Sequence, residues 1–196
     1  MQKEKVIELL SALAEGYAEW ILQETKKVED LEEEFFRIQA KENLGKCMIA
    51  KDRMLKGIDQ IKRNQDIFSA FQAANLSMQK QFIWTKLREA KLNNLSIKED
   101  EIVLEWRPFQ IGFFLMSLTG LAIPEDEDRE IMDLLWFPTG GGKTEAYSLL
   151  IAFQLFLIRI KGGESSDYFH TDVIMRYTLR ALTLQQFQRA AAVIFA

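Results

Sequence analysis

Cysteine and histidine are almost absent from this sequence of 196 residues, in which Cys47 and His170 each occur once. A single cysteine cannot close a disulfide within the chain, and one cysteine with one histidine is too few for a zinc site. Disulfide-stapled folds and zinc modules are therefore excluded. We expect a protein of a reducing compartment, the cytoplasm, with Cys47 packed on a helix.

Long apolar runs and an excess of positive charge are also missing. The two longest apolar stretches, 111–123 and 148–160, are too short and too interrupted to cross a bilayer. The start at Met1 leads into charged residues rather than the apolar core of a signal peptide. The formal net charge is -4, so any contact with nucleic acid has to come from a local patch. We expect no membrane as a partner.

Only three prolines interrupt the chain, and the first of them is Pro108. Before it, apolar residues recur at helical spacing from Val6 to Ile21, again between residues 35 and 61, and a third time from Asp66 to Phe82. The polar, turn-rich run 93–100 then marks a boundary. We therefore predict a helical region over residues 1–97 and a second domain over residues 98–196.

Strand and helix signals alternate in the second domain. Short apolar segments predict strands at 102–104, around 133–137 and at 172–177, and helical patterns cover 111–121, 145–160 and 181–195. This order is typical of the α/β class, in which helical crossovers join parallel strands and ligands bind at the carboxyl ends of the strands. We expect the acidic run 124–130 to be a solvated loop that binds no metal.

The chain is organised around a glycine-rich stretch at residues 138–144, Pro-Thr-Gly-Gly-Gly-Lys-Thr. Glycine lets the backbone take up positive φ, so that N–H groups can close around an anion. The helix that follows would present its positive N-terminal end to the same anion. The pattern predicts a site for ATP and Mg²⁺ that is made by Thr139 and Gly140–Gly142, with Lys143 on the outer phosphates and Thr144 on the metal.

The match to the general phosphate-loop pattern has one departure. Phe137 stands where that pattern places its first glycine, five residues before Gly142. The alternative interpretation is therefore a glycine-rich turn between strand and helix, with a lysine that binds nothing.

Three stretches resemble the first RecA-like domain of superfamily 2 helicases. They are 107–110, which reads Arg-Pro-Phe-Gln, the glycine-rich stretch, and 175–189. The longer runs 134–147 and 175–189 look most like the helicase-type component of a bacterial anti-phage defence system, and 70–78 resembles a helix that precedes the motor there. The resemblance implies an α/β chain: an N-terminal helical region, followed by the beginning of a parallel-sheet RecA-like P-loop NTPase domain that stops after motif Ia.

The same resemblance implies roles for individual residues. Gln110 would read adenine through both hydrogen-bonding groups of its carboxamide, or else it is simply a polar helix residue. Thr178, Arg180 and Gln185 would contact the backbone of nucleic acid, with Arg180 on phosphate. Arg189 is expected to be solvated or paired with an acidic neighbour. The implied partners are DNA, either single-stranded or at a duplex junction, and a further subunit of the defence system.

A complete motor of this class also needs a later Asp-Glu pair and a second RecA-like domain, and neither is in the sequence. We therefore expect the N-terminal part of an ATP-dependent DNA helicase or translocase of phage defence, inactive as a chain of 196 residues. Two other interpretations stay open. One is a helical interaction or regulatory module with a vestigial nucleotide site. The other is a nucleotide kinase or GTPase-type switch, which would leave 175–189 unexplained.

Overall fold

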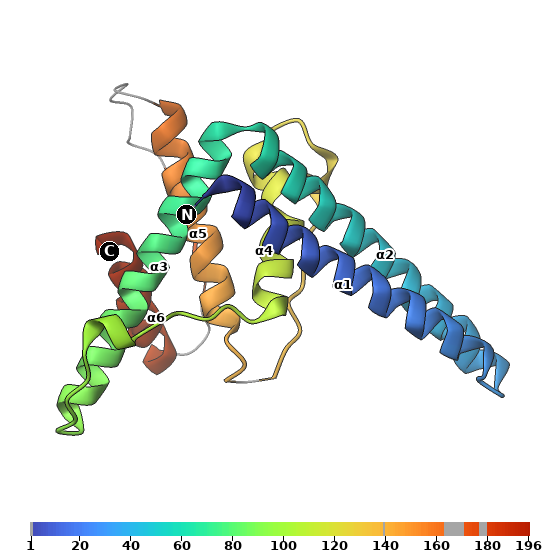
Figure 1. Cartoon of the computed structure of the whole chain (residues 1–196), viewed down its shortest axis with the longest axis horizontal. Helices are drawn as coiled ribbons and strands as arrows, with labels where there is room; N and C mark the ends of the chain where they lie inside the picture. The colour runs from blue at the N-terminus through green and yellow to red at the C-terminus, as the bar shows by residue number, and fades with distance from the viewer. Residues whose placement is uncertain (1, 139, 163–170, 177–179) are drawn as a thin grey trace. The chain divides into compact units, whose positions relative to one another are not determined.

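The computed structural model describes residues 2–138, 140–162, 171–176 and 180–196, with only the backbone described for 180–185. The chain in these ranges forms helices joined by irregular segments (Figure 1). The α-helices are α1 (Lys3–Glu29), α2 (Glu34–Arg63), α3 (Gln65–Leu92), α4 (Pro108–Ala122), α5 (Lys143–Gly162) and α6 (Arg180–Phe195), and two short 3₁₀ turns are η1 (Glu99–Glu101) and η2 (Glu127–Glu130). The six helices confirm the predicted helical segments, and Pro108 is the first residue of α4, as expected.

No residue in the ranges just given belongs to a β-strand. The predicted α/β class, with the beginning of a parallel-sheet RecA-like domain, is therefore wrong. The apolar segments 102–104 and 133–137 have no regular secondary structure, and the same is true of 172–176. Residue 177, the last of the third predicted strand, lies outside the described residues. Apolar composition predicts burial or extension, but a strand exists only when a neighbouring strand bonds to its backbone.

Side chains of α3 take the place of a partner strand for the segment 102–106. The Gln79 carboxamide donates from Nε2 to the carbonyl of Ile102 at 2.9 Å and accepts at Oε1 from the N–H of Leu104 at 2.8 Å. The indole Nε1 of Trp106 donates to Asn75 Oδ1 at 2.9 Å. Because a helix satisfies these backbone groups, the segment runs alongside α3 without forming a sheet.

The chain divides into two compact units that are not consecutive in sequence. One unit contains Met1–Gln65 and Ile111–Leu135, and the other contains Asp66–Gln110 and Trp136–Ala196. The predicted domain boundary between residues 97 and 98 stays a prediction. None of the helices in the described ranges has the length and hydropathy that a bilayer crossing requires.

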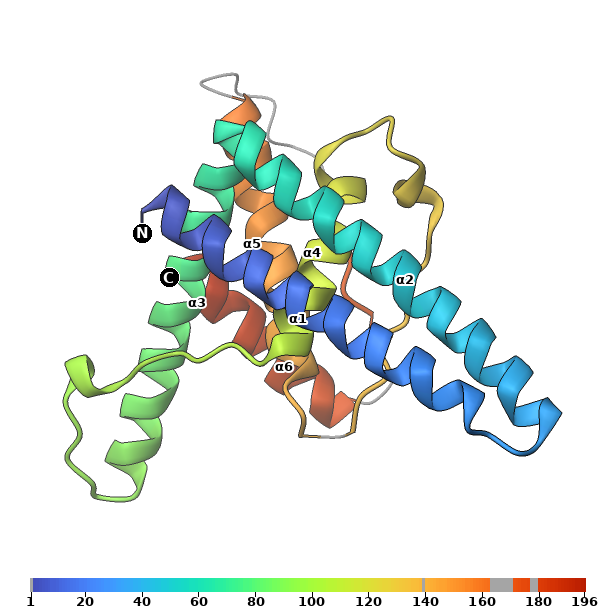
Figure 2. The same cartoon turned by 45° about the vertical axis from the view of Figure 1, so that its right-hand side comes forward.

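In the first unit, α1 and α2 pack against each other as an antiparallel hairpin (Figures 1 and 2). The buried apolar residues of α1 follow helical spacing: Val6, Leu10, Ala14, Ile21 and Val28. The glycines of α2 do not break it. Gly57 lies so close to α4 that a Cβ there would sit 3.1 Å from the carbonyl carbon of Leu115 and 3.3 Å from its Cα. The close approach of the two backbones therefore requires glycine at this position.

A buried ion cluster ties the acidic segment to α2 within the same unit. Arg53 donates to both carboxylate oxygens of Asp133, at 2.6 and 2.8 Å, and its Nε lies 3.4 Å from Asp128. The hydrogen bonds with Asp133 raise the pKa of the Arg53 guanidinium, which keeps its charge despite burial. The expectation of a solvated loop over 124–130 is therefore wrong for Asp128, because a basic side chain from α2 allows this carboxylate to be buried.

The second unit is built on α3, α5 and α6. Its core contains the apolar faces of α3 and α5, with Val193 from α6: Ile67, Phe68, Ala70, Phe71, Ala74, Met78, Ala146, Leu149, Ala152, Phe153 and Leu157. The Ser77 hydroxyl donates to the carbonyl of Val193 at 2.6 Å, so α6 is anchored to α3 by a buried hydrogen bond. The helical spacing from Asp66 to Phe82 predicts one stripe of Phe68, Phe71, Asn75, Met78 and Phe82. Phe68, Phe71 and Met78 are confirmed as core, whereas Asn75 and Phe82 are half-buried.

Two glycines of α2 offer a matched test of the helix crossing. Gly57→Ala forces a Cβ against the backbone of Leu115, which cannot rotate away, and we expect a loss of about 1–3 kcal/mol in the free energy of unfolding. Gly45 has no atom within 4 Å of its missing Cβ, so Gly45→Ala should stabilise by about 0.5–1 kcal/mol. Chemical denaturation of both variants measures the difference, and equal midpoints would contradict the close crossing.

Candidate functional site

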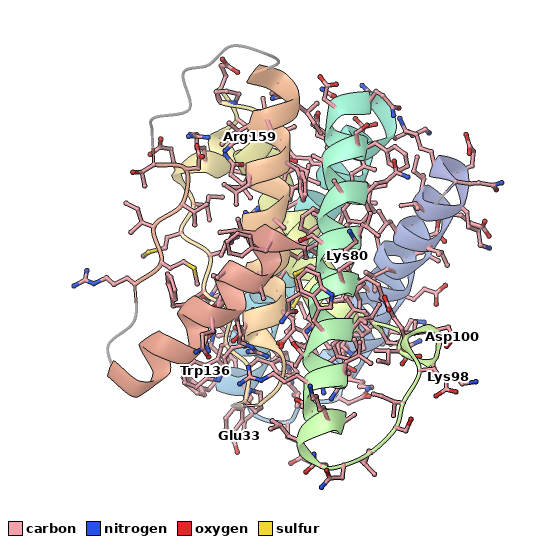
Figure 3. The ribbon with its side chains drawn as sticks, turned by 90° about the vertical axis from the view of Figure 1, so that its left-hand side faces the viewer. Glu33, Lys80, Lys98, Asp100, Trp136 and Arg159 are labelled. Carbon is pink, nitrogen blue, oxygen red and sulfur yellow. The ribbon has the colours of Figure 1, made fainter. Side chains whose placement is uncertain are left out.

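The glycine-rich stretch forms a tight loop directly ahead of α5, as the sequence predicted. Gly140 and Gly142 have φ angles of 79° and 92°, a region that other residues rarely adopt. A Cβ on Gly141 would come within 2.9 Å of the Pro138 carbonyl. All three glycines are thus required by this backbone. Thr139 lies outside the described residues. Figure 3 shows Trp136 near the loop end of α5 and Arg159 near the opposite end.

Gln110 holds the loop from the first turn of α4. Its side chain is 4% exposed. Its Oε1 accepts from the N–H of Arg107 at 2.8 Å, and its Nε2 donates to the carbonyl of Gly142 at 2.8 Å. Both ends of the carboxamide are therefore engaged with backbone. The predicted adenine contact would have to use the second proton of Nε2 or the second lone pair of Oε1, so that role stays a prediction.

Arg107 and two aromatic rings make further contacts at the loop. We call these contacts and those of Gln110 the clamp. Arg107 Nη1 donates to the carbonyl of Gly141 at 2.8 Å. The rings of Phe109 and Phe137 stack with centroids 4.0 Å apart and planes 14° from parallel. Phe137, the departure from the general phosphate-loop pattern, therefore has a packing role, and the motif at 107–110 contacts the loop through three of its four residues. Sequence reasoning missed this stacking, although both phenylalanines stand inside the motifs it quoted.

Lys143, the first residue of α5, folds back over the loop. Its ammonium donates to the carbonyls of Phe137 and Pro138, the latter at 3.1 Å. The side chain is thus held at the loop by two backbone carbonyls. Thr144 follows it on the same turn of α5 and is half-buried. These two residues lie where the sequence predicted them relative to the glycines.

An ion pair joins the first turn of α5 to α6. Glu145 accepts from Arg189 of α6 at 2.6 Å, which confirms that Arg189 pairs with an acidic neighbour. Sequence reasoning gave Glu145 no role. This pair offsets the charge of Glu145, while Arg107 and Lys143 bring two positive charges to the loop carbonyls. That balance suits an anion.

Magnesium would need ligands beyond the side chains at the loop. Within the described residues, no group of three or more His, Cys, Asp or Glu side chains is placed to hold a metal. Thr144 supplies one hydroxyl. Mg²⁺ is commonly bound through one or two protein oxygens together with phosphate and water, so the residues present fit a metal that arrives with a nucleotide.

The residues predicted to contact nucleic acid are only partly described. Arg176 is exposed. Thr178 lies outside the described residues, and Arg180 and Gln185 belong to α6 with their side chains outside the described part. The structure therefore brings Gln110, Gly140–Gly142, Lys143 and Thr144 together at one loop, and their roles, like the nucleic-acid contacts, stay predictions.

In the described residues, the chain is helical and carries a glycine-rich loop at the N-terminus of α5. No protein-family model matches the chain. The chain is similar to the DISARM protein DrmA of Bacillus paralicheniformis, with 38% identity over 200 residues. The alignment covers 98% of this chain and 17% of that protein's length. The resemblance predicted from residues 134–147 and 175–189 is thereby confirmed, and the similarity supports a component of a DISARM defence system.

Replacing Gln110 tests the clamp. Gln110→Ala removes the partner of the Arg107 N–H and of the Gly142 carbonyl, two part-buried hydrogen bonds that together contribute about 1–3 kcal/mol. We expect amide hydrogen exchange at Arg107 and Gly141 to rise by roughly tenfold to a hundredfold. Gln39→Ala, at an exposed glutamine of α2, is the control and should leave both amides unchanged. Unaltered exchange at Arg107 in Gln110→Ala would remove Gln110 from the clamp.

Proposed function

We propose that the glycine-rich loop binds the phosphates of ATP–Mg²⁺ in a helicase-like, DNA-translocating protein of a DISARM system. One observation carries this proposal: two glycines at positive φ stand immediately before α5, whose first residue is Lys143. Helix N-termini carry roughly half a positive charge and unpaired N–H groups. The similarity to DrmA supplies the biological setting.

Phosphate binding would exchange one set of acceptors for another. The Lys143 ammonium now donates to two loop carbonyls, and a phosphate oxygen would take over as a charged and therefore stronger acceptor. Arg107 and Gln110 keep the carbonyls of Gly141 and Gly142 occupied. The N–H of Gly141 already donates to the Pro138 carbonyl at 3.1 Å, so the N–H groups of Gly140 and Gly142 would meet the anion. Thr144 would offer its hydroxyl to the metal.

Loss of Lys143 should weaken nucleotide binding selectively. A charge-assisted hydrogen bond contributes about 1.5–3 kcal/mol, so in the full-length protein Lys143→Ala should weaken ATP–Mg²⁺ binding by roughly tenfold to a hundredfold. Lys80→Ala is the matched control, because Lys80 is an exposed lysine of α3 in the same unit (Figure 3). Isothermal titration calorimetry measures both. Equal affinity in wild type and Lys143→Ala would place the phosphates elsewhere.

DNA contact is proposed for the start of α6. Because the net charge is -4, the binding would come from a few cations that neutralise phosphates without reading bases. Arg180→Ala should weaken binding to unrelated single-stranded DNA sequences about equally and lower the salt slope by about one unit. Arg88→Ala, at an exposed arginine of α3, should leave the slope unchanged. A salt series that gives parallel lines for wild type and Arg180→Ala would place Arg180 outside the DNA path.

A helical interaction module with a vestigial nucleotide site is the second candidate function. It is favoured by the helical architecture of the described ranges and by the apolar residues exposed on the α1–α2 hairpin. Nucleotide titration separates the two candidates, because the module would show no binding that depends on Lys143. Guanine selectivity would instead favour a GTPase-type switch.

A further inference from the structure

A shallow groove lies between α1 and α2 near the turn that joins them. It has a volume of about 290 Å³ and is open on one side. Most of its wall is apolar, with Trp20, Val28 and Leu31 on the α1 side and Ala40 and Leu44 on α2. Glu24 and Lys27 also line it and pair with each other at 2.6 Å. The groove therefore offers an apolar floor with its own charges satisfied.

The surface beside the groove is unusually apolar. Phe35, Phe36 and Ile38, on the first turns of α2, are 70%, 53% and 61% exposed. The buried residues of α2 all lie between Arg53 and Ile61, so this end of the helix contributes nothing to the core. In both cartoon views the turn at residues 30–33 lies away from α4 of the same unit (Figures 1 and 2). Clustered exposed apolar side chains of this kind mark interaction sites.

The turn itself is strongly acidic. Five of its six residues from 29 to 34 are exposed carboxylates: Glu29, Asp30, Glu32, Glu33 and Glu34. None of them forms an ion pair with a basic side chain in the described part of the chain. A surface of this sign repels nucleic acid and anionic lipid and attracts a cationic partner. The hairpin end therefore combines an apolar groove with a negative rim.

We propose that this end of the hairpin docks a basic amphipathic helix of another protein. The apolar face of that helix would lie in the groove over Leu44 and Trp20, and its Lys and Arg side chains would pair with the carboxylates of the turn. A groove between two helices accepts an amphipathic helix by its i, i+3, i+4 and i+7 anchors. The surface and the glycine-rich loop have no residue in common and belong to different units, so the proposal does not depend on nucleotide binding.

The groove and the rim would contribute to binding in different ways. Buried apolar anchors set most of the affinity, whereas rim charges mainly raise the association rate and make it sensitive to salt. Substitution in the groove should therefore weaken binding at all ionic strengths. Reversal of the rim charge should weaken it most at low salt.

The experiment uses the 196-residue chain and a synthetic amphipathic helix with leucines on one face and lysines on the other. A twin peptide carries glutamate in place of each lysine. Leu44→Gln tests the groove, and the triple variant E32K/E33K/E34K tests the rim. The controls are Leu9→Gln, at an exposed leucine of α1, and E4K/E8K/E15K, which makes the same charge change elsewhere on the hairpin.

Labelling of Cys47 reports whether the peptide occupies the groove, because Cys47 lines the groove and is the only cysteine in the sequence. We expect the lysine peptide to slow maleimide labelling of Cys47, and each test variant to weaken its binding about tenfold or more. The controls should bind as wild type, and the glutamate twin should not bind. Failure to bind the lysine peptide would overturn the proposal. Binding that leaves Cys47 labelling unchanged, or self-association that protects Cys47 without peptide, would also do so.

Discussion

Two glutamine carboxamides hold the irregular segments of the second unit, and the candidate site depends on one of them. Gln79 bonds to both an N–H and a C=O of the 102–104 segment, and Gln110 does the same for Arg107 and Gly142. A carboxamide can donate and accept at once, so one side chain satisfies two backbone groups that a strand would satisfy in a sheet. The glycine-rich loop is thereby positioned by α4.

In the first unit, an ion cluster holds an irregular segment against a helix. Arg53 lies between Asp128 and Asp133 with all three side chains largely buried. Breaking such a cluster leaves an uncompensated buried charge, which is more costly than never having buried the group. The segment that ends at Leu135 is therefore anchored to α2 before the chain enters the second unit at Trp136. Bidentate geometry at Asp133 makes arginine, rather than lysine, the suitable residue.

The helices could be read from the sequence because their determinants are local. Apolar spacing predicted α1 and α3, and proline at the start of α4 acted as expected. Gly57 is compatible with α2, because its missing Cβ makes room for Leu115. The predicted strands were wrong because their determinants are not local. Whether 102–104 pairs with another strand or with Gln79 depends on which element lies beside it, and no local pattern contains that information.

The sequence by itself determined the helices, the glycine-rich loop with Lys143 after it, and the resemblance to DrmA, since each follows from residue type and spacing along the chain. The tertiary structure decided that no sheet forms in the described residues, that Asp128 is buried with Arg53, and that Gln110 donates a hydrogen bond to the Gly142 carbonyl. These outcomes rest on hydrogen bonds and ion pairs between residues 23 to 80 positions apart. Such contacts exist only once the chain is folded, because backbone and charged groups take whichever partner packing brings within reach.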